Sequence, residues 1–379
     1  MTLVNLGDVC AILMGQAPPG ESYNLSSNGI PLLAGAGDFG LRYPKPKRFT
    51  TDAIRVSKQG DILLCVRATI GQRNWSDRVY CLGRGVAAIR VRSPELDKVY
   101  LWHWLGYARP ALENRARGST FKQVTRESVE SLSLPLPPLA EQRQIGGILD
   151  AGDRIQRRRL ESIKLLDELL RSAYLEMFGD PVRNEKGWET SRIGDVSSET
   201  QYGTSVRANN HGQGLPVLRM NNITRDGRLD LRDLKSCDIS ERDLNKYTVR
   251  RGDLLFNRTN SPELVGKTAV WDRDEAYSFA GYLVRVRFDQ ERVLPEYVSA
   301  YLNSAFGKNL LFRKAKPSIN MSNISPTELK RLPIPIPPLD VQLKYIAMAA
   351  TTKLARRDIE SAIAIGDSLF QSLLLQIFR

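Results

Sequence analysis

The chain has 379 residues, of which 42% are apolar, and a formal net charge of +13 at pH 7. This apolar content excludes general disorder, and the lack of an 18-residue apolar run and of a signal-peptide pattern favours a cytoplasmic protein without a membrane-spanning helix. The basic excess favours an acidic partner, most often nucleic acid.

Residues 1–138 are expected to form a mixed α/β domain. Short apolar runs at 30–33, 62–66 and 86–91 are typical of strands, while aromatic residues and leucines at helical spacing predict a helix over 98–107. Loops rich in glycine and asparagine lie between these runs. With 18 basic and 11 acidic residues, the segment carries a net charge of +7.

A long helix is predicted over residues 139–178. This stretch has no proline, its apolar residues lie mostly three or four apart, and the Pro-x-Pro-Pro sequence before it suits a helix start. Gly179 and Pro181 supply a stop signal just beyond it. At the usual rise per residue, a helix of this length spans roughly 60 Å. The spacer 139–181 has a net charge of −1.

Residues 182–338 are expected to form a second mixed α/β domain, followed by a second spacer helix over 339–379. Strand-like runs lie at 254–257 and 282–288, and a helix is predicted over 295–306. The domain has 25 basic and 19 acidic residues, a net charge of +6, whereas the second spacer carries only +1. Nearly all the positive excess therefore lies in the two domains, which predicts that the domains contact nucleic acid.

Each long helix carries an apolar stripe that it must bury. Because the two helices have equal length, we expect them to pack on each other. The alternative is that each helix packs on its own domain. The apolar pattern of the second helix slips around Arg356 and Arg357, which would disturb a coiled-coil seam locally.

A proline-rich sequence ends both domains. Residues 134–139 read Leu-Pro-Leu-Pro-Pro-Leu, and residues 334–339, at an offset of 200, read Ile-Pro-Ile-Pro-Pro-Leu. A glutamine follows each segment, Gln142 in the first half and Gln342 in the second.

A second repeated motif lies inside the domains. A Gly-Asp-Ile/Leu-Leu sequence occurs at 60–63 and again at 252–255, and an arginine follows each copy, Arg67 and Arg258. A period near 200 residues is too long for a solenoid unit, which needs about 20–50 residues. The chain is therefore interpreted as a duplication of one domain together with its helix.

Taken together, the two Pro-Pro segments with their glutamines, the two Gly-Asp motifs and the two long helices resemble the specificity subunits of type I restriction–modification systems, the HsdS family. The resemblance covers essentially the whole chain and rests on the ordered duplication. It implies an α+β fold in which two similar target recognition domains are separated by two long helices that form an antiparallel coiled coil, with an internal pseudo-two-fold axis.

The resemblance also implies the function and the partners. The chain would bind double-stranded DNA, dock two methyltransferase (M) subunits and restriction (R) subunits, and have no catalytic site, cofactor or metal of its own. Because the loops differ between the halves, the two half-sites should differ in sequence, which predicts a bipartite, asymmetric target.

The DNA contacts are expected among loop residues whose side chains read bases or bind phosphates: arginine, lysine, asparagine and glutamine. Any one of them could instead be an ordinary solvated loop residue. Arg67 and Arg258 follow matched strands, so a shared structural or phosphate-binding role is expected for them. The first-domain candidates are Lys45, Lys47, Arg48, Arg67, Arg115, Arg117, Lys122 and Gln123, and the second-domain candidates are Arg207, Asn209, Asn210, Asn221, Asn222, Arg225, Arg228, Arg258, Lys316, Asn320 and Asn323.

Three other patterns suggest cofactor or metal sites but lack their usual context. Residues 35–40 fit Gly-x-Gly-x-x-Gly, yet the prolines that follow disfavour the helix such a loop needs. Residues 266–268, Gly-Lys-Thr, resemble the end of a P-loop, yet Ser261 replaces its first glycine. The four cysteines form no Cys-x-x-Cys pair and there are only two histidines, so neither a zinc site nor a disulfide framework is expected.

Two rival functions remain open at this level. The chain could be an enzyme, a nuclease or methyltransferase with an unrecognised site, in which case the pure chain would modify or cleave DNA. It could also be a free-standing DNA-binding protein, in which case the isolated chain would bind specific DNA tightly.

Overall fold

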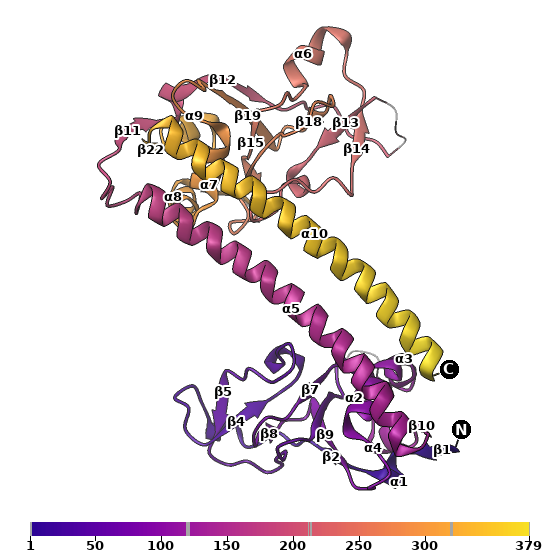
Figure 1. Ribbon diagram of the computed structural model, residues 1–379. Helices are drawn as coiled ribbons and strands as arrows, with labels where there is room; N and C mark the ends of the chain where they lie inside the picture. The colour runs from indigo at the N-terminus through magenta and orange to yellow at the C-terminus, as the bar shows by residue number, and fades with distance from the viewer. Residues whose placement is uncertain (1, 119–121, 211, 213, 319–320, 379) are drawn as a thin grey trace. The chain divides into compact units, whose positions relative to one another are not determined.

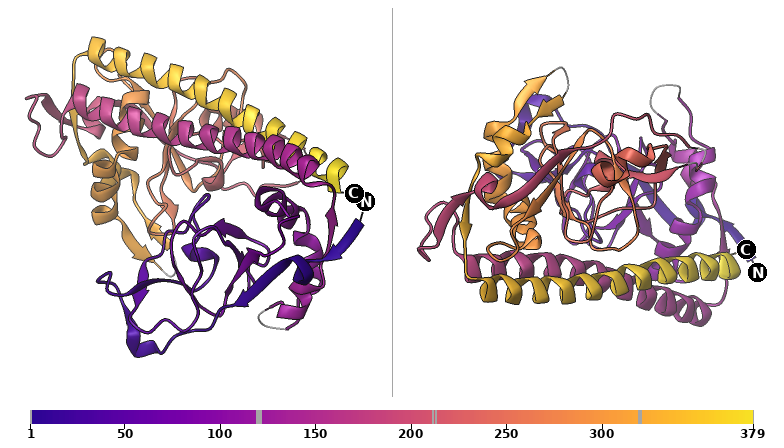
Figure 2. Two further views of the ribbon diagram at one scale, coloured as in Figure 1. Left: turned by 60° about the horizontal axis from the view of Figure 1, so that its bottom comes forward. Right: turned by 90° about the horizontal axis from the view of Figure 1, so that it is seen from above.

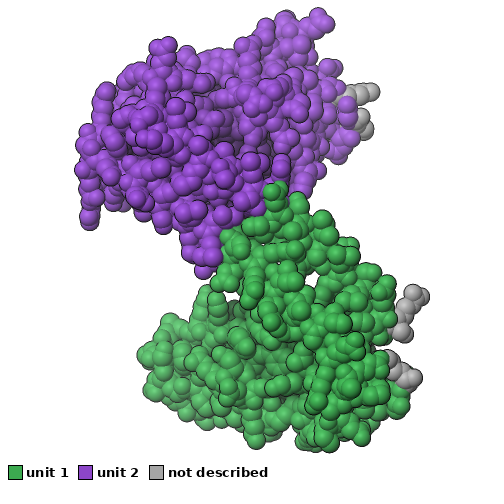
Figure 3. Space-filling model, viewed as in Figure 1, with its two compact units in different colours: residues 1–163, 358–379 green, residues 164–357 purple. Residues whose placement is uncertain are grey.

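The computed structural model describes residues 2–118, 122–210, 212, 214–318 and 321–378. The chain divides into two compact units, which Figure 3 shows in different colours. Unit 1 consists of residues 1–163 and 358–379, and unit 2 of residues 164–357. Helices and sheets occur in both units, as an α+β fold requires.

Both predicted long helices are present. They are α5 (Leu139–Phe178) and α10 (Leu339–Phe378), and each contributes residues to both units (Figure 1). Unit 1 is consequently discontinuous in sequence, because it takes the first part of α5 and the last part of α10.

Unit 1 is built on two four-stranded sheets. One is wholly antiparallel, with the strand order β2-β9-β6-β7, and the other has the order β3-β5-β4-β8, in which β4 and β8 pair in parallel. The strands predicted from apolar runs, β4, β6 and β9, lie at central positions in these sheets. The bounds are β2 (Cys10–Met14), β3 (Tyr23–Asn24), β4 (Ile30–Leu33), β5 (Arg48–Thr50), β6 (Ile62–Cys65), β7 (Arg73–Trp75), β8 (Cys81–Leu82) and β9 (Val86–Val91).

Short helices and a two-stranded ladder complete unit 1. β1 (Thr2–Asn5) pairs antiparallel with β10 (Ser133–Leu136), which is the proline-rich strand that leads into α5. The helix predicted over 98–107 is α2 (Lys98–Tyr107), and Asp97 caps it by accepting hydrogen bonds from two backbone amides. The remaining helices are α1 (Leu6–Val9), α3 (Arg109–Asn114) and α4 (Arg126–Glu130).

Unit 2 repeats this plan. Its main sheet has the order β12-β19-β15-β17, a second sheet has the order β14-β13-β18 with β13 and β18 parallel, and β11 pairs with the proline-rich β22. The strands are β11 (Glu189–Arg192), β12 (Ser197–Tyr202), β13 (Leu215–Leu218), β14 (Lys235–Cys237), β15 (Leu254–Asn257), β17 (Thr268–Val270), β18 (Ser278–Phe279), β19 (Leu283–Phe288) and β22 (Pro333–Ile336).

One predicted helix of unit 2 is wrong in its extent. Instead of a single helix over 295–306, α7 (Pro295–Asn303) ends at Ser304, and α8 (Ala305–Lys314) begins there. The hydroxyl of Ser304 accepts a hydrogen bond from the backbone N–H of Gly307 at 3.1 Å, so a new N-cap interrupts the apolar pattern. Two further short helices are α6 (Leu244–Tyr247) and α9 (Pro326–Lys330).

The ends of the long helices lie in the cores of the units. In unit 1 the ring of Phe378 lies 5.4 Å from those of Tyr100 and Tyr107, and in unit 2 the ring of Phe178 lies 4.7 Å from that of Tyr297. Tyr345 of α10 packs 5.3 Å from Phe178. The last turn of each helix thus lies in the core beside the domain of the other half of the chain. Residues near the start of each helix, such as Leu149 of α5 and Tyr345 of α10, lie in the core that contains its own domain. Packing on the domains and packing between the helices therefore both contribute to burying the stripes.

Polar contacts also join the two helices within unit 1, where they run side by side (Figure 2). Gln156 donates a hydrogen bond to the carbonyl of Ile363 at 2.9 Å, and Arg159 donates to the carbonyl of Ala362 at 2.8 Å. By length and composition α10 is apolar enough to cross a bilayer, although it contains no apolar run of 18 residues. Only 11% of its most apolar 18-residue window is buried within the protein, so much of this apolar surface stays exposed.

Candidate nucleic-acid interface

The Gly-Asp motif builds the turn that starts the central strand of each main sheet. Gly60 and Gly252 both have φ +87°, a left-handed conformation that side chains disfavour. The carboxylate of Asp61 accepts a hydrogen bond from the backbone N–H of Lys58 at 2.7 Å, and Asp253 accepts the equivalent bond from Arg250 at 2.7 Å.

The same buried carboxylates pair with an arginine of the neighbouring strand. Arg90 of β9 donates to Asp61 through Nε at 2.8 Å and Nη2 at 2.7 Å, and Arg287 of β19 donates to Asp253 through Nε at 2.7 Å. Because each carboxylate is paired with an arginine, the attraction between the charges offsets part of the desolvation free energy of placing them close to the core. The motif is thus a structural device that fixes β6 and β15.

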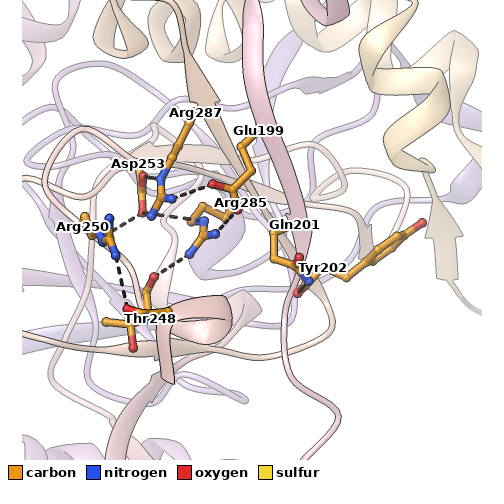
Figure 4. Close-up of polar contacts among 9 residues, drawn as sticks. Glu199, Gln201, Tyr202, Thr248, Arg250, Asp253, Arg285 and Arg287 are labelled. Atoms are coloured by element: carbon orange, nitrogen blue, oxygen red, sulfur yellow. Dashed lines mark hydrogen bonds and ion pairs between the residues drawn. The ribbon is translucent and has the colours of Figure 1, made fainter. Parts of the chain in front are cut away.

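Unit 2 extends this pair into a network. Figure 4 shows Glu199 between Arg285 and Arg287, and the buried Arg285 also donates to the carbonyl of Thr248 at 2.6 Å. Partial burial alone would raise the pKa of Glu199, but the two arginines outweigh it and lower the pKa. Ala88 stands at the register position of Arg285 in unit 1, so the extension belongs to unit 2 alone.

A short hairpin lies beside the residue that follows the central strand of unit 1. Val124 donates its backbone N–H to the carbonyl of Val66 at 3.0 Å, and Ala68 donates to that of Lys122 at 3.2 Å. Residues 119–121 lie outside the described residues. This pairing brings together four predicted DNA contacts, all exposed: Arg67, Arg117, Lys122 and Gln123.

Unit 2 has the equivalent hairpin, made of β20 (Lys316–Ser318) and β21 (Met321–Asn323), and β21 pairs with β16 (Thr259–Asn260). Arg258 donates from Nη2 to Oδ1 of Asn323 at 3.1 Å, and its guanidinium lies 5.2 Å from the ring centre of Tyr202. This arrangement brings together the predicted DNA contacts Arg258, Lys316 and Asn323. The predicted contact Asn320 lies outside the described residues.

The other predicted contacts of unit 1 lie on separate loops. Lys45 and Lys47 are exposed in the loop that leads into β5, and Arg48 begins that strand. Arg115 is exposed and donates at 3.1 Å to both the carbonyl of Ser128 and the hydroxyl of Ser131, so part of its donor capacity is used within the unit.

The other predicted contacts of unit 2 come from two loops. Arg207, Asn209 and Asn210 precede β13, and Asn209 forms a β-bridge with Ser236. The loop at 219–233 carries the exposed Asn221 and Arg225 and the half-buried Arg228, which pairs with Asp226 at 2.7 Å.

The structure argues against base contact by Asn222. Its side chain is only 1% exposed, donates to the carbonyls of Asp230 at 2.8 Å and Asp233 at 3.0 Å, and accepts from the backbone N–H of Arg219 at 2.8 Å. The amide N–H groups and the amide oxygen of Asn222 are therefore engaged within the loop at 219–233. The prediction that Asn222 contacts DNA is wrong. The sequence could not distinguish it from its exposed neighbour Asn221.

Two residues that shape the candidate interface of unit 2 were missed by the sequence analysis. Tyr202 is exposed at the end of β12, and its ring packs under Arg258. Lys267 is buried and donates from Nζ to the carbonyls of Met220 at 2.8 Å and Ile223 at 2.6 Å. The lysine of the P-loop-like sequence therefore shapes the 219–233 loop, and its ammonium is committed to the protein itself.

The remaining cofactor-like patterns do not form the expected structures. Residues 36–38 form a single 3₁₀ turn, and Phe39 pairs with Pro44 in a β-bridge where a dinucleotide loop would begin its helix. Among the described residues, no group of histidine, cysteine, aspartate or glutamate side chains could hold a metal ion.

The glutamine after each Pro-Pro segment ties its helix to the domain. Gln142 is fully buried, donates to the carbonyls of Glu95 and Pro137 at 2.8 Å each, and accepts from the backbone N–H of Asp97 at 2.8 Å. Gln342 makes the equivalent contacts in unit 2, including one from the backbone N–H of Leu294 at 2.8 Å.

Comparison with protein families gives one match that covers most of the chain. The family described as the type I restriction modification DNA specificity domain matches residues 1–165 and 185–348. The two matched regions correspond to the two copies of the internal repeat.

Several curated proteins are similar in sequence. The putative type I restriction enzyme MjaX specificity subunit of Methanocaldococcus jannaschii is 38% identical over 40% of this chain and 37% of that protein. The EcoKI specificity subunit of Escherichia coli K12 is 26% identical over 72% of this chain and 62% of that protein, and the EcoBI subunit of E. coli is 23% identical over 99% and 85%. The chain therefore spans less than two thirds of the length of the first two relatives.

Two solved structures share the fold. The type I restriction–modification S subunit of M. genitalium superposes with a TM-score of 0.62 at 12% identity and covers 100% of this chain and 96% of its own. A chain from a structural study of complex assembly and conformational transition in a type I restriction–modification system has a TM-score of 0.55 at 20% identity and covers 100% and 97%.

Proposed function

The chain belongs to the family of type I restriction–modification DNA specificity subunits, and on this premise we propose that it reads a bipartite, asymmetric DNA target and delivers it to methyltransferase and restriction subunits. Residues 1–138 and 182–338 act as the two target recognition domains, and residues 139–181 and 339–379 as the spacer helices.

The observation that carries this proposal is the repeated hairpin beside Arg67 and Arg258. In both units the hairpin gathers cationic and amide side chains next to the residue that follows the central strand. Arginine and lysine can bind phosphates, and asparagine and glutamine can pair with adenine. Since the flanking loops differ in length and sequence, each domain reads its own half-site.

The long helices serve as the docking surface for two methyltransferase subunits. In unit 1 the first part of α5 contacts the last part of α10, and in unit 2 the last turn of α5 contacts the start of α10. This supports an antiparallel coiled coil with a pseudo-two-fold axis, which would offer equivalent positions to two copies of one partner. In unit 1 an apolar groove of about 470 Å³ lies between the helices. The large apolar side chains that line this groove and remain exposed support a protein partner: Ile148, Ile155, Ile365 and Leu369.

The chain acts as a recognition and scaffold subunit without a reaction of its own, and it requires no cofactor. Two of its buried carboxylates support this assignment, because Asp61 and Asp253 are engaged in structural ion pairs with Arg90 and Arg287. The partners supply the chemistry, and double-stranded DNA is the ligand.

The test is a map of methylated adenines in the source genome with and without this gene. Deletion should abolish methylation at one gapped, asymmetric motif, and the reintroduced gene should restore it. Loss of an ungapped motif, or no loss, would contradict the proposal. The purified chain should neither methylate nor cleave DNA, and the rival reading as a free-standing binder requires tight specific binding without any partner.

A further inference from the structure

We propose that Arg42 is a positioning residue that couples the DNA-contacting loop of the first domain to α5. The inference rests on the proposed function and deepens it, because it names a residue through which reading of the first half-site reaches the helix that docks the methyltransferase.

Arg42 lies in a small, well-defined hairpin. The backbone N–H of Gly40 donates to the carbonyl of Tyr43 at 3.1 Å, and that of Lys45 donates to Asp38 at 2.7 Å. The buried side chain of Asn74 in β7 both accepts from and donates to the backbone of Gly40, each at 3.0 Å. The hairpin is therefore held against the main sheet and is not a freely moving loop.

The side chain of Arg42 leaves this hairpin and reaches α5. Its Nη1 donates to Oδ1 of Asp150 at 3.1 Å and lies 4.0 Å from Asp153, while its carbonyl accepts from the backbone N–H of Trp75 at 2.8 Å. The side chains of Arg42 and Asp150 are only 23% and 16% exposed, so the pair is screened less than an ordinary surface ion pair.

The helix-side carboxylate is kept charged at neutral pH. Burial alone would raise the pKa of Asp150, but hydrogen bonds from Arg154 and Arg42 outweigh it and lower the pKa. Arg154 donates at 3.1 Å to the other oxygen of the same carboxylate, yet it belongs to α5 itself and does not connect the helix to the loop.

The chain that continues from this hairpin carries the predicted DNA contacts Lys45, Lys47 and Arg48. A shift of these residues onto a phosphate backbone would move Arg42 and its tie to α5. In unit 2 the corresponding helix positions, 200 residues on, are Ala350 and Lys353, and Lys353 pairs instead with Asp272, which follows β17. The coupling therefore belongs to the first domain.

The test uses the full chain assembled with its methyltransferase subunit. Affinity is measured for the target duplex and for two duplexes that each carry a base substitution in one half-site. A photo-crosslinker at position 45 identifies the half-site that the first domain reads. Arg42→Gln should reduce discrimination at that half-site at least about fivefold, the lower end of usual coupling effects, and leave the other half-site unchanged.

Arg154→Gln is the matched control, because it removes the second arginine from Asp150 without untying the loop, and it should preserve discrimination at both half-sites. Asp150→Asn breaks the tie from the helix side and should reproduce the selective loss. Equal effects of Arg42→Gln and Arg154→Gln, or equal losses at both half-sites, would overturn the inference. Failure of the wild-type complex to discriminate at either half-site would overturn the proposed function, and the coupling with it.

Discussion

At the scale of single residues, the motifs that mark the family are structural. Asp61 and Asp253 fix the turn before a central strand, and Gln142 and Gln342 fix the start of a long helix. The residues that would touch DNA lie instead on exposed loops between these fixed points. Motif recognition alone therefore identifies the scaffold better than the interface.

Gln142→Ala should lower the free energy of unfolding by about 2–4 kcal/mol, because it leaves one buried donor and two buried acceptors without their partner. Gln144→Ala, two residues along the same helix and exposed, should change it by less than about 0.5 kcal/mol. Urea denaturation of the two variants measures the difference. Similar midpoints would show that the hydrogen bonds of Gln142 contribute little to stability.

The stability of unit 2 should depend on pH through Glu199. Its pKa is lower in the folded protein than in an unfolded chain, where the pKa of a glutamate is about 4.3. The stabilisation is therefore present above that unfolded value and is lost as the pH falls through the folded value.

Glu199→Gln should destabilise the protein at pH 7, since it leaves the buried Arg285 with one acidic partner fewer, and should flatten the loss of stability on acidification. Thermal unfolding of both proteins between about pH 7 and pH 3, a range that includes the pKa of an unfolded glutamate, measures the pH dependence of the two stabilities. Parallel curves would contradict this role of Glu199.

Sequence reasoning reached part of the candidate interface. Arg67 and Arg258 recur after matched strands, and the structure places a hairpin beside each of them. Their contact with phosphate stays a prediction. Sequence reasoning could not separate Asn222 from Asn221, because burial depends on where a loop closes. Nor could it pair Arg42 with Asp150, since the two residues lie 108 positions apart in the sequence.

At the scale of elements, periodicity predicts the long helices well and the smaller ones less well. α5 and α10 lie at their predicted positions because a proline-rich sequence precedes each of them and apolar residues recur at helical spacing along most of their length. The predicted helix over 295–306 fails at Ser304, whose hydroxyl caps a new helix and interrupts the apolar pattern. Local capping can thus override periodicity.

The last turn of α10 should contribute to the stability of unit 1. Phe378 is 5% exposed and packs on Tyr100 and Tyr107, so Phe378→Ala should cost about 3 kcal/mol. Leu375→Ala, one turn earlier on the exposed side, should cost less than about 1 kcal/mol. Hydrogen exchange at the α2 amides measures both effects, and equal protection in the two variants would place Phe378 outside the core.

At the scale of the whole molecule, the net charge of +13 resides in residues 1–138 and 182–338, which carry +7 and +6. Phosphate contacts release counterions, so affinity for the target should fall steeply as salt concentration rises. Segment-by-segment charge could be predicted from the sequence alone. The sequence could not predict which arginines and lysines are exposed, which are in salt bridges and which are buried, as the buried Arg285 and Lys267 show.

Arg67→Ala and Arg258→Ala should each lower the slope of log affinity against log salt by about 1, and should weaken binding to all sequences alike, as loss of one phosphate contact predicts. Arg171→Ala, exposed on α5, is the control and should leave the slope unchanged. Salt titrations of the methyltransferase complex on the target duplex and on a duplex of unrelated sequence measure the slope and the sequence preference. A change in sequence preference would assign base reading to the arginine concerned.

The discontinuity of unit 1 determines the order in which the nascent chain can fold. Residues 164–357 leave the ribosome as one uninterrupted stretch, so unit 2 can close its core while synthesis continues. Unit 1 emerges earlier but lacks Leu374 and Phe378 until the end of α10 has been made. A premature stop codon within α10 would therefore damage the domain that was translated first.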